Sequence, residues 1–289
     1  MRRVLGIGDN VVDKYVHLGM MFPGGNALNF AAFAKLSGVE AAYLGVFGND
    51  ASATHIRQVL EELNVDTSRC RIHPGENGYA RVSLVDGDRV FLPGNKGGVS
   101  SRFPIRLDAT DLAYIKGFDL LHSSCYSFLE SEIPILRQTG IPFSFDFSDE
   151  IDDAYLQRIC PSVDFAFLSC GHLTEDQTRE KLADCLSYGC GYALGSRGAE
   201  GAWLYDGHAY FHQPAKTVRA VDTLGAGDSF ITAFLLHLLP HMKLNGALQP
   251  IQASVLTEGL EKGSEAAVKT CLVQGAFGHG IAYEEIEER

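Results

Sequence analysis

The stretch Gly225-Ala226-Gly227-Asp228 combines small residues with a carboxylate, just before an apolar run at 230–239 that reads as a helix. The first N–H groups of a helix have no partner within it and lie at the positive end of its dipole, so they suit an anion such as phosphate. A carboxylate beside a bound phosphate makes chemical sense if it takes a proton from an attacking hydroxyl, so Asp228 is a candidate general base. The alternative is an ordinary helix start whose Asp complements the dipole.

A second group of polar residues lies near the N-terminus. Asp9 and Asp13 follow a predicted strand at 4–8, where carboxylates suit the hydroxyl groups of a polyol or serve as turn residues. Gly25 leads into an Ala-rich helix, and Asn29 lies one turn further on. Its amide can donate and accept, as a sugar requires, although tight helix packing would explain it too.

Short apolar stretches and helical stretches alternate along the chain and must position these residues. Strands are expected at 4–8, 41–46, 119–123, 142–147, 165–169 and 192–194, and helices at about 26–36, 50–63, 130–139, 151–159, 174–188, 230–239 and 251–273. This alternation is typical of an α/β fold in which helices cover both faces of a mainly parallel sheet. Ligands bind at the carboxyl ends of such strands, where Asp9, Ser169, Ser196 and Asp222 all fall.

One stretch breaks this rhythm. Residues 79–85 and 89–92 flank Asp86-Gly87-Asp88, a hairpin signal. We expect a small β-flap outside the main sheet, formed from about 12–22 and 77–94, that acts as a lid over Asp9 and Asp13. Arg89 is a polar residue of the second strand of this hairpin. It is a candidate for substrate binding, and the alternative is an ordinary solvated strand residue. The open edge of the flap is a surface that a second subunit could cover, giving a homodimer.

Composition narrows the class of protein. The 289 residues are 46% hydrophobic, enough for the core of one large domain spanning 1–289. The net charge of −12 argues against nucleic acid or an anionic membrane as a partner. No apolar run is long enough to span a membrane, and the 7 scattered cysteines without a leader sequence favour reduced thiols and a cytoplasmic location. No cluster shows metal-ligand spacing.

Taken in order, these motifs resemble those of ribokinase-type (PfkB-type) carbohydrate kinases, over about residues 4–278. The resemblance rests on Gly8-Asp9-Asn10-Val11-Val12-Asp13, Gly24-Gly25-Asn26-Ala27-Leu28-Asn29, the flap hairpin, Gly198-Ala199-Glu200-Gly201 and Asp222-Thr223-Leu224-Gly225-Ala226-Gly227-Asp228. It implies a ribokinase-like fold and the transfer of phosphate from ATP to a sugar hydroxyl.

The resemblance also implies roles for single residues. Asp228 is then the base, and the N–H groups of Gly225, Ala226 and Gly227 form an anion hole for the γ-phosphate. The sugar is held by Asp9, Asp13, Gly25 and Asn29. The ATP site is lined by Ser196, Gly198 and Gly201, with the segment from Lys269 to Gly278 near adenine. Asp222 and the carbonyl of Leu224 match positions that hold a monovalent cation such as K⁺, while Mg²⁺ travels with ATP and keeps several waters.

Weaker matches point to a subgroup, the fructoselysine 6-kinases. They are Asp88-Arg89-Val90-Phe91, Phe145-Asp146-Phe147-Ser148-Asp149 and Asp164-Phe165-Ala166-Phe167, together with the first motif. The first-choice substrate is therefore fructoselysine, phosphorylated on its 6-hydroxyl. A cationic amine suits an acidic site. Open alternatives are another ketose or fructosamine, such as fructose or a keto-sugar acid, a nucleoside, and a non-catalytic sugar-binding regulator.

The chain departs from the family pattern after the strand at 165–169. Many members carry Asn-x-x-Glu there, whereas this chain has Ser169-Cys170-Gly171-His172. The residues around the Mg²⁺-bound waters are therefore different, and Glu175 is the candidate to replace the missing glutamate.

Overall fold

The computed structural model describes residues 2–85, 88–244 and 247–284, with only the backbone of 84–85, 88–89, 243–244 and 247–248. Within these residues one sheet has nine strands in the order β13-β12-β11-β10-β9-β8-β1-β4-β5. The strands from β11 to β5 run parallel, and β12 and β13 add an antiparallel hairpin at one edge. Their bounds are β1 (Arg3–Gly8), β4 (Glu40–Phe47), β5 (Arg71–Ile72), β8 (Leu120–Ser124), β9 (Phe143–Asp146), β10 (Phe165–Ser169), β11 (Tyr192–Ser196), β12 (Ala202–Tyr205) and β13 (Tyr210–Gln213).

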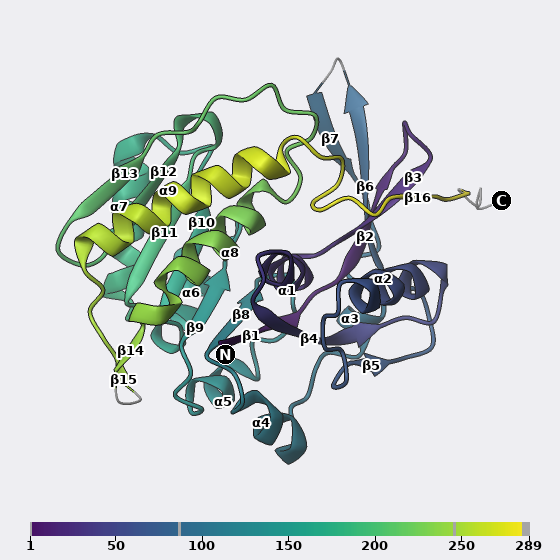
Figure 1. Ribbon diagram of the computed structural model, residues 1–289, viewed down its shortest axis with the longest axis horizontal. Helices are drawn as coiled ribbons and strands as arrows, with labels where there is room; N and C mark the ends of the chain where they lie inside the picture. The colour runs from purple at the N-terminus through teal and green to yellow at the C-terminus, as the bar shows by residue number, and fades with distance from the viewer. Residues whose placement is uncertain (1, 86–87, 245–246, 285–289) are drawn as a thin grey trace.

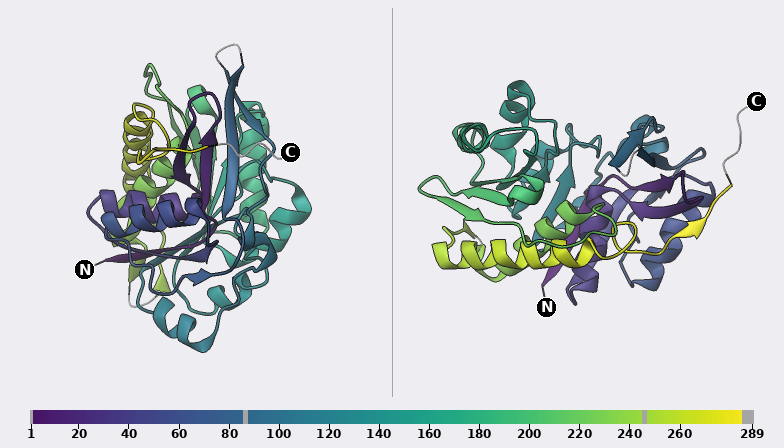
Figure 2. Two further views of the ribbon diagram at one scale, coloured as in Figure 1. Left: turned by 90° about the vertical axis from the view of Figure 1, so that its right-hand side faces the viewer. Right: turned by 90° about the horizontal axis from the view of Figure 1, so that it is seen from above.

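Helices cover both faces of this sheet, as the alternation predicted (Figure 1; Figure 2). One face carries α1 (Asn26–Leu36), α8 (Ala226–Leu238) and α9 (Ala253–Thr270). The other carries α4 (Ala109–Ile115), α5 (Ile133–Arg137), α6 (Asp153–Ile159) and α7 (Glu175–Ser187). The two faces follow from the period of 2 along a strand. In β10, Phe167 packs edge-on against Phe234 of α8, whereas Leu168 belongs to the opposite cluster with Leu182 of α7.

The second sheet has five strands in the order β16-β3-β2-β6-β7. It contains the expected hairpin, β6 (Gly78–Val85) with β7 (Asp88–Leu92), whose tip at 86–87 lies outside the described residues. The stretch at 12–22 that was expected to join the flap contains two antiparallel strands, β2 (Val11–Tyr15) and β3 (Met20–Gly24), with a turn between them. The fifth strand, β16 (Ile281–Ala282), comes from far along the chain and pairs with β3. The second sheet therefore has a member that the flap prediction lacked.

Local signals account for several boundaries. The side chain of Asp50 caps α2 (Ala51–Glu62) by accepting from the N–H of Ala53 at 2.9 Å, as expected from Asn49-Asp50. Thr174 and Gln177 form a capping box at the start of α7. The remaining elements are short: α3 (Val99–Arg102), β14 (Lys243–Leu244), β15 (Ala247–Leu248) and the 3₁₀ turns Cys160–Ser162, Gly198–Glu200 and Leu239–His241. Among the described helices, none has the length and apolar character needed to cross a membrane.

Candidate active site

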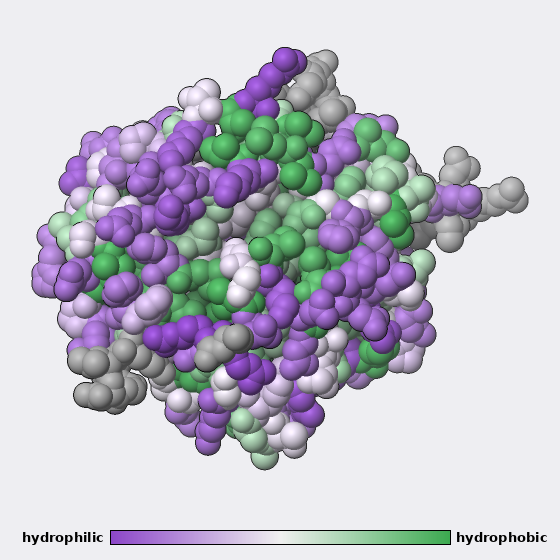
Figure 3. Space-filling view, in the orientation of Figure 1, coloured by the Kyte–Doolittle hydropathy of each residue, from purple (hydrophilic) through white to green (hydrophobic). Residues whose placement is uncertain are grey.

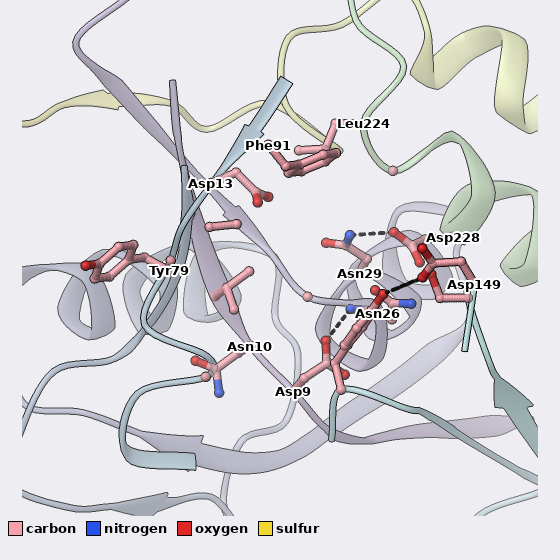
Figure 4. Close-up of a pocket in the computed structure, with 18 of the residues that line it drawn as sticks. Asp9, Asn10, Asp13, Asn26, Asn29, Tyr79, Phe91, Asp149, Leu224 and Asp228 are labelled. Carbon is pink, nitrogen blue, oxygen red and sulfur yellow. Dashed lines mark hydrogen bonds between the residues drawn. The ribbon is translucent and has the colours of Figure 1, made fainter. Parts of the chain in front are cut away.

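A cavity of about 1020 Å³ lies between the carboxyl ends of the central strands, the start of α8 and the second sheet (Figure 4). Its lining includes most of the sugar-site candidates, namely Asp9, Asp13, Gly25 and Asn29, together with Gly225 and Asp228. Parallel strands end at one edge, which is why residues so distant in sequence meet here. Its size is at the upper end of the roughly 300–1,000 Å³ typical of ligand pockets.

Asp228 lies in the first turn of α8 and contacts Asn29 of α1. Nδ2 of Asn29 donates to Oδ2 of Asp228 at 2.7 Å, as Figure 4 shows. Burial, and then the negative charges of Asp146, Asp9 and Asp13, raise the pKa of Asp228 to about 8, although the bond from Asn29 opposes this. Asn29 is itself buried, and its Oδ1 has no hydrogen-bond partner. The pair therefore presents a carboxyl group with a pKa near neutral and an unpaired acceptor.

The start of α8 is open toward an anion. Gly225 precedes the helix in the left-handed region (φ 73°), and no side chain caps the first N–H groups. A Cβ on Gly225 would lie 2.4 Å from Cβ of Ala276, so the position requires glycine. A Cβ on Gly227 would meet nothing within 4 Å. The positive end of the helix dipole and the uncapped N–H groups thus lie next to Asp228, in the first turn of α8.

Asp9 is bonded more fully than the sequence suggested. Its carboxylate accepts from the N–H groups of Asn26 (2.7 Å) and Ala27 (3.2 Å) at the start of α1. It also accepts from the hydroxyls of Ser124 (2.8 Å), the last residue of β8, and Ser127 (2.9 Å), just after that strand. Asp9 therefore fixes the start of the helix that carries Asn29, in addition to lining the cavity.

Asp13 and Gly25 lie on the wall formed by the second sheet. Asp13 points from β2 into the cavity in Figure 4 and is buried. A Cβ on Gly24 would lie 2.1 Å from Oδ2 of Asp13, so this pairing of strands needs the glycine. Gly25 has φ 108°, and a Cβ there would lie 2.7 Å from Cα of Asn10. Close approach of the Asp13 side chain to Gly24, and of the backbone of Asn10 to Gly25, explains the glycine pair without a ligand.

Asp222 joins three separate segments. Its Oδ1 accepts from the N–H of Leu224 at 3.0 Å. Its Oδ2 accepts from the N–H of Gly275 at 3.0 Å and from the hydroxyl of Tyr15 in β2. Both carboxylate oxygens therefore already accept hydrogen bonds, and a monovalent cation at Asp222 and the Leu224 carbonyl would share them.

The other predicted positions lie around the cavity or away from it. Ser196 ends β11, and Gly198 and Gly201 begin and follow the next 3₁₀ turn with φ of 55° and 93°. Lys269 lines a different cavity, of about 710 Å³, between α1, α8 and α9. Glu175 begins α7 and does not line the main cavity, whereas His172 does. The side chain of Arg89 lies outside the described residues.

Several residues of the site were not among the predicted site residues, although Asp146 and Asp149 belong to the stretch 145–149 that indicated the subgroup. Asp146, at the end of β9, accepts from Nδ2 of Asn26 at 2.7 Å, and burial raises its pKa to about 6. Asp149 and Glu150 line the cavity from the turn after β9. Tyr126 lines it too, and its hydroxyl donates to Asp149. The available signal was their position after a predicted strand end.

Among described residues, no group of three or more His, Cys, Asp or Glu side chains is placed to hold a metal ion.

Comparison with known proteins agrees with this geometry. The chain is 42% identical over 282 residues to the fructosamine kinase FrlD of Bacillus subtilis, covering 97% of this chain and 95% of that protein. It is 32% identical to the fructoselysine 6-kinase of Escherichia coli, covering 96% of this chain and 100% of that protein. The structure of Arabidopsis thaliana ribokinase complexed with ribose and ATP superposes with a TM-score of 0.77 at 19% identity, covering 95% of this chain and 94% of that one. Residues 3–250 match the family described as pfkB family carbohydrate kinase, and the chain belongs to that family of kinases.

Proposed function

We propose that this protein is an ATP-dependent kinase that phosphorylates a primary hydroxyl of a fructosamine, with the 6-hydroxyl of fructoselysine as first choice. Two relatives support the substrate class, one named fructosamine kinase and one fructoselysine 6-kinase. The single observation that supports the chemistry is the pair of Asn29 and Asp228 beside the uncapped start of α8.

In this reaction Asp228 takes the proton of the attacking hydroxyl while that oxygen forms a bond to the γ-phosphorus and the bond to the ADP oxygen breaks. Asn29 orients the carboxylate, and its unpaired Oδ1 can accept from a sugar hydroxyl. The N–H groups of Gly225, Ala226 and Gly227 stabilise negative charge as it develops on the phosphoryl oxygens. ATP supplies the phosphoryl group when bound.

The nucleotide is assigned to Ser196, Gly198 and Gly201, beyond the carboxyl end of β11. The uncapped helix start and the left-handed glycines fit a polyphosphate that approaches the backbone. We assign Mg²⁺ to ATP and its waters, with Glu175 in the outer shell, and a monovalent cation to Asp222 and Leu224. Replacing K⁺ by Na⁺ at constant ionic strength tests the cation, and the Mg²⁺ dependence of Glu175→Gln tests the glutamate.

The test of the function is ADP release from MgATP with fructoselysine, other fructosamines, fructose, ribose and nucleosides. Selective turnover of fructoselysine supports the proposal. Turnover of another sugar or of a nucleoside would support kinase activity but contradict fructoselysine as the substrate. Binding of ATP without turnover of any compound favours a non-catalytic regulator, a reading that leaves the raised pKa of Asp228 without a use.

A homodimer through the second sheet is a separate proposal. Its outer strand β7 carries Val90, which is 37% exposed and does not line the cavity that the next residue, Phe91, lines. Figure 3 shows apolar side chains gathered beside the described part of the β6–β7 hairpin. Light scattering of wild type and Val90→Ser decides it, since a monomeric wild type contradicts the proposal.

A further inference from the structure

The described lining of the main cavity is strongly acidic. It includes the carboxyl groups of Asp9, Asp13, Asp149, Glu150 and Asp228, against the single amine of Lys96 and the imidazole of His172. The carboxylate of Asp9 is already hydrogen-bonded to the start of α1 and to Ser124 and Ser127, and Asp228 is hydrogen-bonded to Asn29. Asp149 and Glu150 have no comparable structural use. A site that brings a sugar to a polyphosphate gains nothing from extra negative charge, because like charges repel. The pair therefore points to a cation.

Asp149 and Glu150 are held in place by a defined turn. The N–H of Ser148 donates to Oδ1 of Asp146 at 2.8 Å, and Ser148 has φ 52°, a conformation rare for a residue other than glycine. The N–H of Glu150 donates to the carbonyl of Phe147 at 2.9 Å. The backbone strain at Ser148 is thus coupled to presenting the next two carboxylates at the cavity.

An aromatic side chain accompanies these carboxylates. Tyr126 donates to Oδ1 of Asp149 at 3.2 Å and is itself 44% exposed. Tyr79 and Phe91 line the same cavity from the second sheet, and in Figure 4 Tyr79 lies on the opposite side from Asp149. An aromatic ring beside carboxylates suits an ammonium group on an apolar stem.

A second observation indicates that a ligand belongs in this cavity. Asn29 is only 4% exposed, lines the cavity, and has an Oδ1 without a hydrogen-bond partner. A buried acceptor left unpaired costs free energy that a ligand donor, such as a sugar hydroxyl, would recover. The cavity therefore has a polar end at Asn29 and an acidic, aromatic wall at Asp149 and Glu150.

We propose that Asp149 and Glu150 bind the cationic amine carried by the substituent of the sugar, and so select a charged fructosamine over a neutral ketose. This inference rests on the proposed function, since it assigns the substituent of the same substrate. The sugar ring lies toward Asn29 and Asp228, and the amine lies toward the turn after β9.

The test compares wild type with the double variant Asp149→Asn/Glu150→Gln at saturating MgATP, using fructoselysine and fructose. We expect kcat/KM for fructoselysine to fall about 10- to 100-fold, mainly through KM, while kcat/KM for fructose stays the same. Added salt should raise KM for fructoselysine in wild type and leave it unchanged in the variant. Asp153→Asn/Asp176→Asn removes the same charge from exposed residues that do not line the cavity, and should change neither substrate.

Each other outcome contradicts the inference in its own way. An equal fall for both sugars, or a higher Mg²⁺ requirement, assigns the pair to the metal or to catalysis. If wild type turns over neutral sugars alone, the protein is a kinase, but its substrate carries no cationic amine. If wild type turns over no sugar, the proposed function fails, and calorimetric titration with fructoselysine then decides the inference: equal affinity for wild type and variant overturns it.

Discussion

Nδ2 of Asn29 lies 2.7 Å from Oδ2 of Asp228, and 199 residues separate the two along the chain. Asn29 is fixed on α1, whose start is held by Asp9, while Asp228 is fixed on α8, which packs on α1. The carboxyl group is therefore oriented by two packed helices rather than by a loop. Such orientation matters in phosphoryl transfer, because positioning supplies much of the rate.

Asp228→Asn removes the proposed proton acceptor and keeps the size of the side chain. We expect kcat to fall by about 10²–10⁴ with little change in KM, measured by ADP release. Turnover close to that of wild type would refute the assignment.

Asp228→Asn should also change how the stability of the protein depends on pH. Burial and the neighbouring carboxylates raise the pKa of Asp228 from 3.8 to about 8 in the folded state, so the folded protein binds this proton more tightly than the unfolded chain. The stability that this group contributes is present below about pH 4 and is lost as pH rises through about 8. At pH 9 the variant should therefore unfold at a higher urea concentration than wild type.

The pH dependence of the reaction follows from the same group. Only the ionised carboxylate accepts a proton, so kcat/KM should rise with pH and level off above about 8. Asp146→Asn removes a negative charge that helps raise this pKa, so the rise should move to lower pH. Initial rates from pH 5 to pH 10 check both. Asp176→Asn, on the exposed start of α7, is the control, and an unmoved profile in Asp146→Asn would contradict the electrostatic coupling.

Gly225 and Gly227 lie two residues apart and make a matched pair for substitution. Gly225→Ala places a Cβ against Ala276 at φ 73°, which should cost at least about 1–3 kcal/mol of unfolding free energy and lower activity. Gly227→Ala meets nothing within 4 Å and lies inside α8, so it should be stable or gain about 0.5–1 kcal/mol. Urea unfolding measures both changes. Equal destabilisation by the two substitutions would mean that the left-handed position is not what requires Gly225.

Tyr15→Phe removes the hydroxyl that donates to Asp222. A hydrogen bond to a charged group contributes about 1.5–3 kcal/mol, so the unfolding free energy should fall by that order. Tyr205→Phe loses only an exposed bond to the carbonyl of Gly207 and should stay within about 0.5 kcal/mol of wild type. If both variants unfold alike, the Tyr15–Asp222 contact contributes nothing measurable.

Much of the fold could be predicted, because its signals are local. Asn49-Asp50 marked the start of α2, and the apolar strands ending in polar residues marked the edge of the sheet where the site lies. The turn between β2 and β3 was not predicted, because the sequence from 12 to 22 was interpreted as one extended stretch. The pairing of β16 with β3 was missed as well, because two exposed residues carry no pattern of their own and only tertiary contact selects them.

The site divides in the same way. Position after a strand indicated Asp9, and position at a helix start that follows glycines indicated Asn29 and Asp228. The structure gathers all three at one cavity. The partners of Asp9 could not be found, because Ser124 and Ser127 lie more than a hundred residues away and look like any other serines. The resemblance implies that Lys269 lies near adenine, which stays a prediction, and in the structure this residue lines the second cavity.

The segment after α9 has a consequence for how the two substrates influence each other. Gly275 donates to Asp222 beside the start of α8, close packing against Phe22 continues at Gly280, and β16 then joins the second sheet at β3. The covalent stretch from Gly275 to β16 thus joins the start of α8, where we propose that phosphate binds, to the second sheet, where we propose that the sugar binds. We expect this segment to couple the two binding sites. Nucleotide and sugar should then change each other's affinity by the same factor, as thermodynamic reciprocity requires.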